Sequence, residues 1–212
     1  MPLQKRQMQR SLIAVKERIR KFTLEQRREM SFEDVFAKSS AVQERLINSP
    51  FLHACLACKT TRPCRVALYS SFQNEVLTDV VFEYAAGKGM DIYFPKALRE
   101  TRHVAFFKVT SMAGMCPGSY DILEPSANEE EAKPETLDLI IVPGVAFDTN
   151  GGRIGYGKGY YDKALANAKC PIIALAYDFQ VLNERLPAEP HDIPVTAIIT
   201  EKRVITANRK AR

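Results

Sequence analysis

The chain has 212 residues, of which 46% are hydrophobic and 26% are charged, and its net charge is +5. These values are typical of a globular protein with a buried core and exclude a disordered or fibrous chain. The longest apolar runs are far shorter than the roughly 20 residues that cross a bilayer, so we expect no transmembrane helix. The mild positive charge suits anionic ligands, although it is also compatible with an ordinary basic surface.

The N-terminal part of the sequence predicts helices. The first ten residues are polar and basic and lack the apolar stretch of a secretory signal, so we expect a cytoplasmic location. Apolar residues at helical spacing predict an amphipathic helix over residues 3–20. Thr23 and Gln26 form a capping box for a second helical region, which Pro50 ends. We expect this helical region, residues 1–50, to pack on the sheet of a single domain over residues 1–212.

From Arg65 onward, short apolar runs alternate with helical patterns. The alternation predicts a three-layer α/β fold: an open, largely parallel sheet with helices on both faces. Residues 125–134 are interpreted as an exposed loop. The expected strands cover residues 66–69, 90–94, 103–109, 139–142 and 172–177, and the expected helices after residue 65 cover residues 76–85 and 160–168.

A cluster of sulfur and imidazole groups lies at His53, Cys55, Cys58 and Cys64. Thiolates beside a histidine can hold zinc, and the gap between Cys55 and Cys58 has the usual spacing. No second cysteine pair completes the pattern, however. We therefore favour free thiols in a reducing compartment over a metal site.

Six of the ten glycines fall between Gly144 and Gly159, directly after the strongest apolar strand. Such a cluster costs stability through the entropy of the unfolded chain. Its second half contains Lys158 and precedes a predicted helix. Converging backbone N–H groups, an ammonium and a helix start are what a phosphate group requires. Asp162 and Asp148 are candidate ligands of a magnesium ion that bridges phosphates.

The pattern is neither a Walker motif nor a dinucleotide fingerprint, because its lysine is not followed by Ser or Thr and its glycines are spaced differently. A tight turn with a solvated lysine is an equally good interpretation of the residues alone. The longer segment from Pro143 to Asp162 resembles the signature of the 5-formyltetrahydrofolate cyclo-ligase family, also called methenyltetrahydrofolate synthetases. Weaker parallels include residues 69–78, 118–125 and 191–194.

The resemblance implies an enzyme that uses ATP and magnesium to convert 5-formyltetrahydrofolate to 5,10-methenyltetrahydrofolate, with release of ADP and phosphate. ATP would phosphorylate the formyl oxygen, and N10 would then attack the activated carbon. Such chemistry needs aligned substrates and a charge clamp rather than a protein nucleophile.

The resemblance also implies roles for individual residues. Lys158 and Tyr160 would be catalytic, and Glu75 would contact the pterin, for which a carboxylate is a suitable acceptor. Asp162 and Asp148 would bind magnesium, because Thr196 stands where the family commonly has a carboxylate. The residues expected to bind ATP are Arg6, Arg10, Gly155, Tyr156, Gly157, Lys158, Gly159, Tyr160 and Tyr161. Those expected to bind the folate are Phe72, Glu75, Phe147, Tyr160 and Tyr161.

Two other functions stay open at this point. A regulatory protein that binds nucleotide or folate without turnover is one, and a related ATP-dependent ligase with another substrate is the second. The expected partner is 5-formyltetrahydrofolate, with or without a polyglutamate tail. We expect no nucleic-acid or membrane partner and a monomer or weak dimer.

Overall fold

The protein is described by a computed structural model over residues 3–57, 61–98, 100, 103–118, 121–126 and 128–207, with side chains from residue 11 onward. The strands of its central sheet are β1 (Arg65–Ala67), β2 (Asp91–Leu98), β3 (His103–Lys108), β6 (Glu131–Ala132), β7 (Leu139–Val142), β10 (Ile172–Leu175), β12 (Ala197–Ile199) and β13 (Val204–Thr206). Their order is β13-β12-β10-β7-β1-β2-β3-β6. The strands from β12 to β2 are parallel, and the outer strands are antiparallel.

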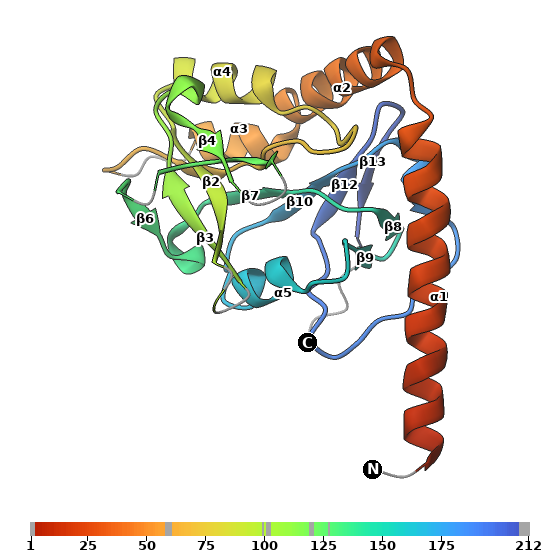
Figure 1. The fold of residues 1–212 in the computed structure, drawn as a ribbon. Coiled ribbons are helices and arrows are strands. Elements are labelled where there is room, and N and C mark those ends of the chain that lie inside the picture. The colour runs from red at the N-terminus through yellow and green to blue at the C-terminus, as the bar shows by residue number, and fades with distance from the viewer. Residues whose placement is uncertain are drawn as a thin grey trace.

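Helices cover both faces of this sheet (Figure 1). The helices are α1 (Leu3–Arg28), α2 (Phe32–Ile47), α3 (Pro50–Ala57), α4 (Asp79–Gly87) and α5 (Tyr160–Leu165). Helices α2, α3 and α4 pack on one face and α5 packs on the other, while α1 lies along one side of the molecule. The predicted fold class, a three-layer and largely parallel α/β sheet, is confirmed.

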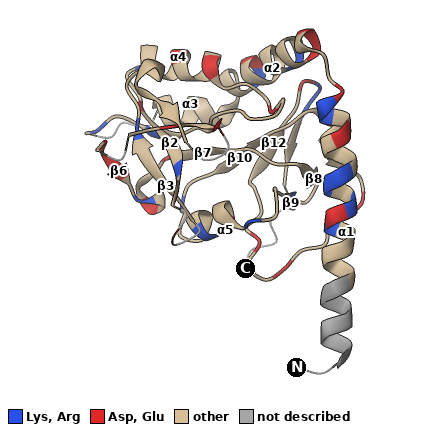
Figure 2. Ribbon diagram, in the orientation of Figure 1, with Lys and Arg blue, Asp and Glu red and all other residues tan. Residues whose placement is uncertain are grey.

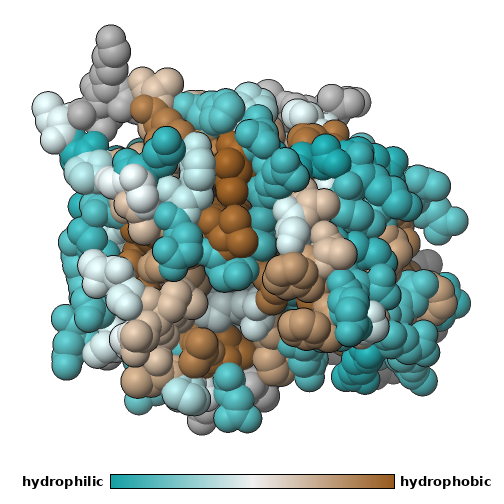
Figure 3. Space-filling view, turned by 90° about the horizontal axis from the view of Figure 1, so that it is seen from above, coloured by the Kyte–Doolittle hydropathy of each residue, from teal (hydrophilic) through white to brown (hydrophobic). Residues whose placement is uncertain are grey.

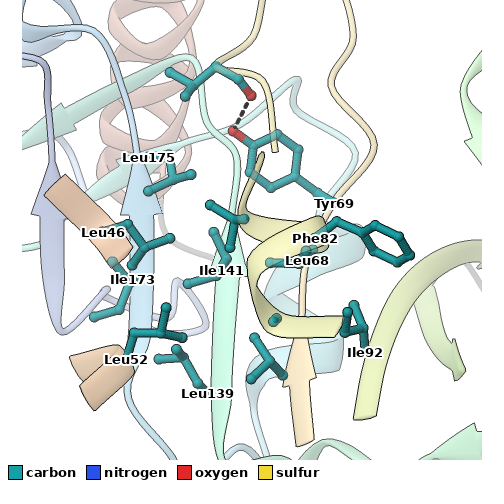
Figure 4. Close-up of a cluster of buried hydrophobic side chains, with 14 of the residues drawn as sticks. Leu46, Leu52, Leu68, Tyr69, Phe82, Ile92, Leu139, Ile141, Ile173 and Leu175 are labelled. Carbon is teal, nitrogen blue, oxygen red and sulfur yellow. Dashed lines mark hydrogen bonds between the residues drawn. The ribbon is translucent and has the colours of Figure 1, made fainter. Parts of the chain in front are cut away.

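Each central strand contributes to two hydrophobic cores. Leu139 and Ile141 of β7 pack with α2, α3 and α4, whereas Ile140 and Val142 pack on the α5 side. This is the pattern of a parallel strand that is buried on both faces. Figure 4 shows the first core, in which the hydroxyl of Tyr69 donates to the carbonyl of Val76 at 2.8 Å. That bond anchors the loop after β1 to the core.

Two small sheets complete the fold. One has the order β11-β8-β9 and contains β8 (Ala146–Asp148), β9 (Arg153–Ile154) and β11 (Val181–Leu182). It lies next to α1 (Figure 1). The other pairs β4 (Cys116–Pro117) with β5 (Leu123–Glu124). The sequence patterns did not predict these short strands.

The N-terminal helices differ from the prediction. Helix α1 continues past Thr23, whose hydroxyl donates to the carbonyl of Ile19 at 3.0 Å instead of capping a helix. Threonine commonly makes this bond within a helix. The cap of α2 is Ser31, which accepts from the N–H of Asp34 at 3.1 Å. Pro50 ends the helical region as predicted but also begins α3, because proline is well suited to a first helical position.

Three other boundaries also differ. Strand β2 continues through Pro95, which lies beyond the part of β2 that pairs with β1, so its missing N–H breaks no bond on that side. The predicted loop at residues 125–134 contains the edge strand β6. Helix α5 ends at Leu165, three residues before the predicted end.

The surface carries mixed charges with apolar groups between them. Basic and acidic residues are interspersed along the described part of α1, whereas the central strands carry few charges (Figure 2). Seen from the side of α2 and α4, hydrophilic side chains cover much of the surface (Figure 3). Phe32 and Phe36 are exposed on α2, with ring centroids 6.4 Å apart. No helix among the described residues has the length and apolar character that a bilayer crossing requires.

Replacing Ser31 with alanine should lower the free energy of unfolding by about 1 kcal/mol, because the first turn of α2 would lose its side-chain acceptor. Urea-induced unfolding followed by circular dichroism measures this loss. Ser40→Ala is the matched control, since Ser40 lies inside α2 and bonds only the carbonyl of Phe36. Equal losses in the two variants would contradict the capping role of Ser31.

Candidate active site

The carboxyl ends of β1, β7 and β10 open onto one edge of the sheet, where the loops that follow these strands meet. Gln180 ties two of the loops together, because its Nε2 atom donates to the carbonyls of Gly144 at 3.0 Å and Val145 at 2.9 Å. Ligands of open parallel sheets bind at this kind of edge. The loops therefore define the candidate site.

Arg27 and Glu75 form a buried ion pair at this edge. Their side chains are 1% and 5% exposed, and Nη1 of Arg27 lies 3.7 Å from Oε1 of Glu75. Nη1 also donates to the carbonyl of Gly144 at 3.3 Å, and Nη2 donates to the hydroxyl of Tyr156. One guanidinium thus connects α1 with the loops after β1 and β7 and with the glycine-rich loop.

The turn before Glu75 holds both partners of the ion pair. Gln73 and Asn74 have positive φ angles of 47° and 58°, which is unfavourable for residues other than glycine. Oε2 of Glu75 accepts from the N–H of Phe72 at 3.1 Å. The amide of Asn74 donates to the carbonyl of Arg27 at 2.9 Å and so satisfies a group at the end of α1. The strained turn therefore orients the carboxylate and fixes the helix end beside it.

The environment of Glu75 brings its titration close to neutral pH. Burial raises the pKa of Glu75 from its ordinary value of 4.5 to about 7, against the opposing effects of the Arg27 guanidinium and of hydrogen bonds from Phe72 and Tyr156. Burial likewise raises the pKa of Tyr156 to about 12. A desolvated carboxylate with a specific charge partner at a ligand-binding edge is a strong candidate for a functional group.

The glycine cluster consists of two structurally different halves. The first half forms the hairpin of β8 and β9. Gly151 has a φ of +88°, and a Cβ there would lie 2.5 Å from the carbonyl oxygen of Val195. Gly144 is similarly confined, since a Cβ would lie 2.4 Å from the ring of Phe147. These glycines are explained by packing and need no ligand.

The second half of the cluster faces α1. Arg20 donates from Nε to the carbonyl of Gly155 at 2.8 Å. Gly157 has a φ of +92°, and a Cβ there would lie 3.3 Å from the Arg20 guanidinium. Tyr156 and Lys158 are exposed in the same loop. This segment, residues 155–159, is the part of the cluster that remains suited to a phosphate group.

The aromatic residues around the loop divide into surface and core. Tyr160 and Tyr161 begin α5 directly after Gly159, and both pack partly buried against the core that contains Phe147. The guanidinium of Arg153 lies 5.6 Å from the centroid of the Tyr161 ring. Phe147 is fully buried, so its position does not match the predicted contact with the folate. Its ring supports the site from within.

Asp148 has a structural role in the hairpin. Its side chain is buried, and its oxygens accept from the backbone N–H groups of Asn150 at 2.8 Å, Gly152 at 2.9 Å and Leu186 at 2.7 Å. Such a carboxylate stabilises a turn in the manner of other short polar side chains. The geometry therefore gives no support to the prediction that Asp148 binds magnesium.

Asp162 is less buried than Asp148 and lies at the start of α5. Its Oδ1 atom is 3.0 Å from Nη2 of Arg153 and accepts from the N–H of Ile193 at 3.2 Å. Thr196 lies at the opposite end of the strands from Glu75, where its hydroxyl accepts from the N–H of Ile172 at the start of β10. Because Asp162 is partly exposed and Asp148 is buried, Asp162 is the better placed of the two predicted magnesium ligands.

Three basic residues of α1 that were not singled out from the sequence contact other parts of the chain. The side chains of Arg6 and Arg10 lie outside the described residues. Lys16, Arg20 and Arg27 instead form one helix face, since they are separated by four and seven residues. This face was not predicted, although its helical spacing is present in the sequence.

Lys16 is held by two carboxylates near the C-terminal end of the chain. Its Nζ atom lies 2.7 Å from Asp192 and 3.1 Å from Glu189. Burial alone would lower the pKa of Lys16, but the hydrogen bonds to Asp192 and Glu189 raise it. His191 completes a possible cation-binding group with the two acids, but Lys16 already supplies a positive charge there.

The cysteine prediction is tested only in part, because Cys58 lies outside the described residues. Cys55 is buried and Cys64 is half-buried, and both are free thiols. Their mutual hydrogen bond lowers the pKa of Cys55 and raises that of Cys64. Within the described part of the chain, they belong to no group of three potential metal ligands.

Comparison with known proteins identifies similar sequences and structures. The profile of the 5-formyltetrahydrofolate cyclo-ligase family matches residues 12–201. The 5-formyltetrahydrofolate cyclo-ligase of Haemophilus influenzae is 31% identical over 69% of this chain and 81% of its own length. That of Escherichia coli is 32% identical over 66% of this chain and 79% of its own.

Solved structures agree with the sequence matches. The NMR structure of Aquifex aeolicus 5,10-methenyltetrahydrofolate synthetase is 34% identical, with a TM-score of 0.78 over 93% of this chain and 95% of that one. The Mycoplasma pneumoniae synthetase is 26% identical, with a TM-score of 0.66 over 88% and 98%. Arg6 and Arg10 precede the segment that matches the family profile, whereas Lys16 and Arg20 lie inside it.

Glu75→Gln should change how stability depends on pH. Because the folded pKa of Glu75 is raised, its contribution to stability is complete below the ordinary value of 4.5 and is lost as pH rises through about 7. The free energy of unfolding of the wild type, relative to the variant, should therefore fall by about 3 kcal/mol over this range. Urea unfolding at a series of pH values measures the difference.

The comparison between pH values cancels any constant effect of breaking the ion pair. Glu83→Gln, at an exposed position of α4, controls for removal of a surface charge. A difference between wild type and Glu75→Gln that stays constant from pH 4.5 to pH 8 would contradict a raised pKa at Glu75.

Proposed function

The chain belongs to the 5-formyltetrahydrofolate cyclo-ligase family, and we propose that it binds its folate beside Glu75 and ATP beside residues 155–159. It is an enzyme that converts 5-formyltetrahydrofolate to 5,10-methenyltetrahydrofolate. In the proposed reaction, ATP supplies the phosphoryl group that activates the formyl oxygen. N10 of the folate then attacks the activated carbon, and phosphate leaves. The observation that carries the proposal is the proximity of the buried Arg27–Glu75 pair to the glycine-rich loop that contains Lys158, since Tyr156 of this loop bonds the pair.

The folate subsite is built from Glu75 and the aromatic rings around it. The carboxylate is suited to accept hydrogen bonds from the amino and ring N–H groups of a pterin. The rings of Phe72 and Tyr156 lie beside it, with centroids 6.2 Å apart. Flat apolar surfaces next to a few fixed polar groups are typical of sites for small aromatic ligands.

The proposed ATP subsite combines the glycine-rich loop with basic side chains from the loop itself and from α1. Gly157 has a positive φ, a conformation that occurs in loops whose backbone N–H groups bind anions. Lys158 belongs to the loop, and Arg20 reaches it from α1 through the carbonyl of Gly155. Lys16 lies one helical turn before Arg20. We assign to Lys16 and Arg20 the contacts that the resemblance placed at the start of α1.

Magnesium, when bound, neutralises phosphate charge and aligns the phosphates for transfer. Asp162 fits this ion better than Asp148, since the side chain of Asp162 is 19% exposed and that of Asp148 is fully engaged by backbone N–H groups. Lys158 and Tyr160 flank Gly159 at the start of α5 and orient the phosphates and the formyl group. The chain thus contributes binding, alignment and charge rather than a nucleophile.

The position of Thr196 gives no support to the alternative of a non-catalytic binding protein. Thr196, which replaces a carboxylate of the family, bonds the backbone at the end of the strands away from Glu75. We propose Lys16 and Arg20, rather than Arg6 and Arg10, as the ATP contacts.

Purified protein with ATP, magnesium and 5-formyltetrahydrofolate should form the methenyl product, which absorbs in the near ultraviolet. Lys158→Met should raise KM for ATP by about tenfold or more, because a charge-assisted contact is worth about 1.5 to 3 kcal/mol. Glu75→Gln should instead raise KM for the folate. Lys169→Met, an exposed lysine after α5, is the control. Absence of product while ATP still binds would reject the proposed reaction.

A second set of variants tests the assignment on α1. Lys16→Met and Arg20→Met should each raise KM for ATP by about tenfold, because each removes a cation near the phosphates. Arg6→Met and Arg10→Met, which precede the segment matched by the family, should leave KM for ATP within about twofold of the wild type. Thermal unfolding of each variant verifies its fold. The reverse ranking would return the ATP contacts to Arg6 and Arg10.

A further inference from the structure

Arg27 carries a buried N–H group that the protein does not satisfy. Its Nη atoms bond Gly144 and Tyr156 and approach Glu75, but Nε has no hydrogen-bond partner among the described residues. An unsatisfied buried donor is costly and uncommon in native proteins. Arg65 and Arg153 share this property, but Arg27 is the one of the three that adjoins the proposed folate subsite.

The ring of a folate presents a carbonyl oxygen next to a ring N–H and an amino group. A carboxylate can accept from the N–H and the amino group, but it repels the carbonyl oxygen. A second group must therefore donate to that oxygen. Arg27 is in position to do so, since its guanidinium lies 3.7 Å from the Glu75 carboxylate. Together, the two side chains complement the whole polar edge of the ring.

The hydroxyl of Tyr156 already makes hydrogen bonds to Glu75 and Arg27 like those expected of the folate ring. Its hydroxyl hydrogen bonds to the carboxylate of Glu75 and accepts from Nη2 of Arg27. Its ring lies close to Phe72, and its centroid is 5.6 Å from the Arg27 guanidinium. The hydroxyl thus acts as a donor to Glu75 and an acceptor from Arg27, as the N–H and carbonyl of a pteridine would.

Tyr156 can leave this position without disturbing the core. Its side chain is 40% exposed, and its neighbours in the loop are Gly155 and Gly157. Because its hydroxyl bonds both Arg27 and Glu75, its departure would free one hydrogen-bonding position on each.

We propose that Arg27 determines specificity for the folate by donating to the ring carbonyl of its pteridine beside Glu75, after the Tyr156 hydroxyl has left these two groups. The inference rests on the proposed folate subsite at Glu75. It adds that the pocket distinguishes a ring carbonyl from an amino group at the same position. Because Tyr156 and Lys158 share one loop, folate binding also moves the loop that contacts ATP.

Paired ligands test the role of Arg27. Folic acid has the ring carbonyl and a ring N–H beside it, whereas its 4-amino counterpart has an amino group and lacks that N–H, so both the Arg27 guanidinium and the Glu75 carboxylate should favour folic acid. We expect the wild type to bind folic acid about tenfold or more tightly than the counterpart, by isothermal titration calorimetry. Arg27→Met should remove the part of this preference that depends on the guanidinium and so reduce the ratio of the two dissociation constants severalfold. An unchanged ratio of the two dissociation constants in a folded variant would overturn the proposal.

Arg27→Lys guards against a failure of the methionine variant to fold. It keeps a positive charge beside Glu75 but lacks the planar group that donates from several nitrogens. We expect this variant, too, to show a reduced preference, and a fully retained preference would contradict a role for the guanidinium. If the wild type binds no 5-formyltetrahydrofolate at all, the proposed function fails instead.

Tyr156→Phe tests the position of the hydroxyl. Without it, the folate competes with no internal partner for Arg27 and Glu75, so 5-formyltetrahydrofolate should bind severalfold more tightly. Tyr84→Phe, on α4, is the matched control and should bind as the wild type does. Weaker binding by Tyr156→Phe would mean that the hydroxyl contacts the folate directly, which would overturn its role as a substitute for the ring.

Discussion

The buried ion pair between Arg27 and Glu75 is the interaction on which the rest of the site depends. Removing two charges from water costs several kcal/mol for each ion, and their attraction offsets this only when neighbouring groups supply further hydrogen bonds. The carbonyl of Gly144, the N–H of Phe72 and the hydroxyl of Tyr156 provide them. The loops of the site therefore depend on one another, because each supplies a partner to one of the two charges.

Much of the fold could be predicted because the central strands are buried on both faces. Such strands are continuous apolar runs, and β7 has the predicted bounds, Leu139–Val142. The ends of helices were harder to predict, because a local signal can serve two purposes. Thr23 resembles a helix cap but bonds the preceding turn, and Pro50 both ends one helix and begins another. The short strands β8 and β9 depend on contacts with distant parts of the chain, to which periodicity is insensitive.

The site was predicted less completely than the fold. The resemblance to the family pointed to Glu75 and to the glycine-rich loop, but it did not predict the partner of Glu75. Arg27 is one of many basic residues on α1, and its type alone does not reveal that it is buried. Only its helical spacing from Lys16 and Arg20 distinguishes it. Conversely, Asp148 has the right chemistry for a metal, but three backbone N–H groups use its oxygens.

Helix α1 contacts both proposed subsites, since Arg20 bonds the glycine-rich loop and Arg27 pairs with Glu75. Seven residues of helix separate the two, which is two turns or roughly 10 Å. In the proposed arrangement, the helix therefore fixes the distance between the nucleotide and the folate. One residue inserted between them would rotate Arg27 by about 100° relative to Arg20 and lengthen the spacing by only about 1.5 Å. The segment between the two arginines can thus vary in composition far more readily than in length.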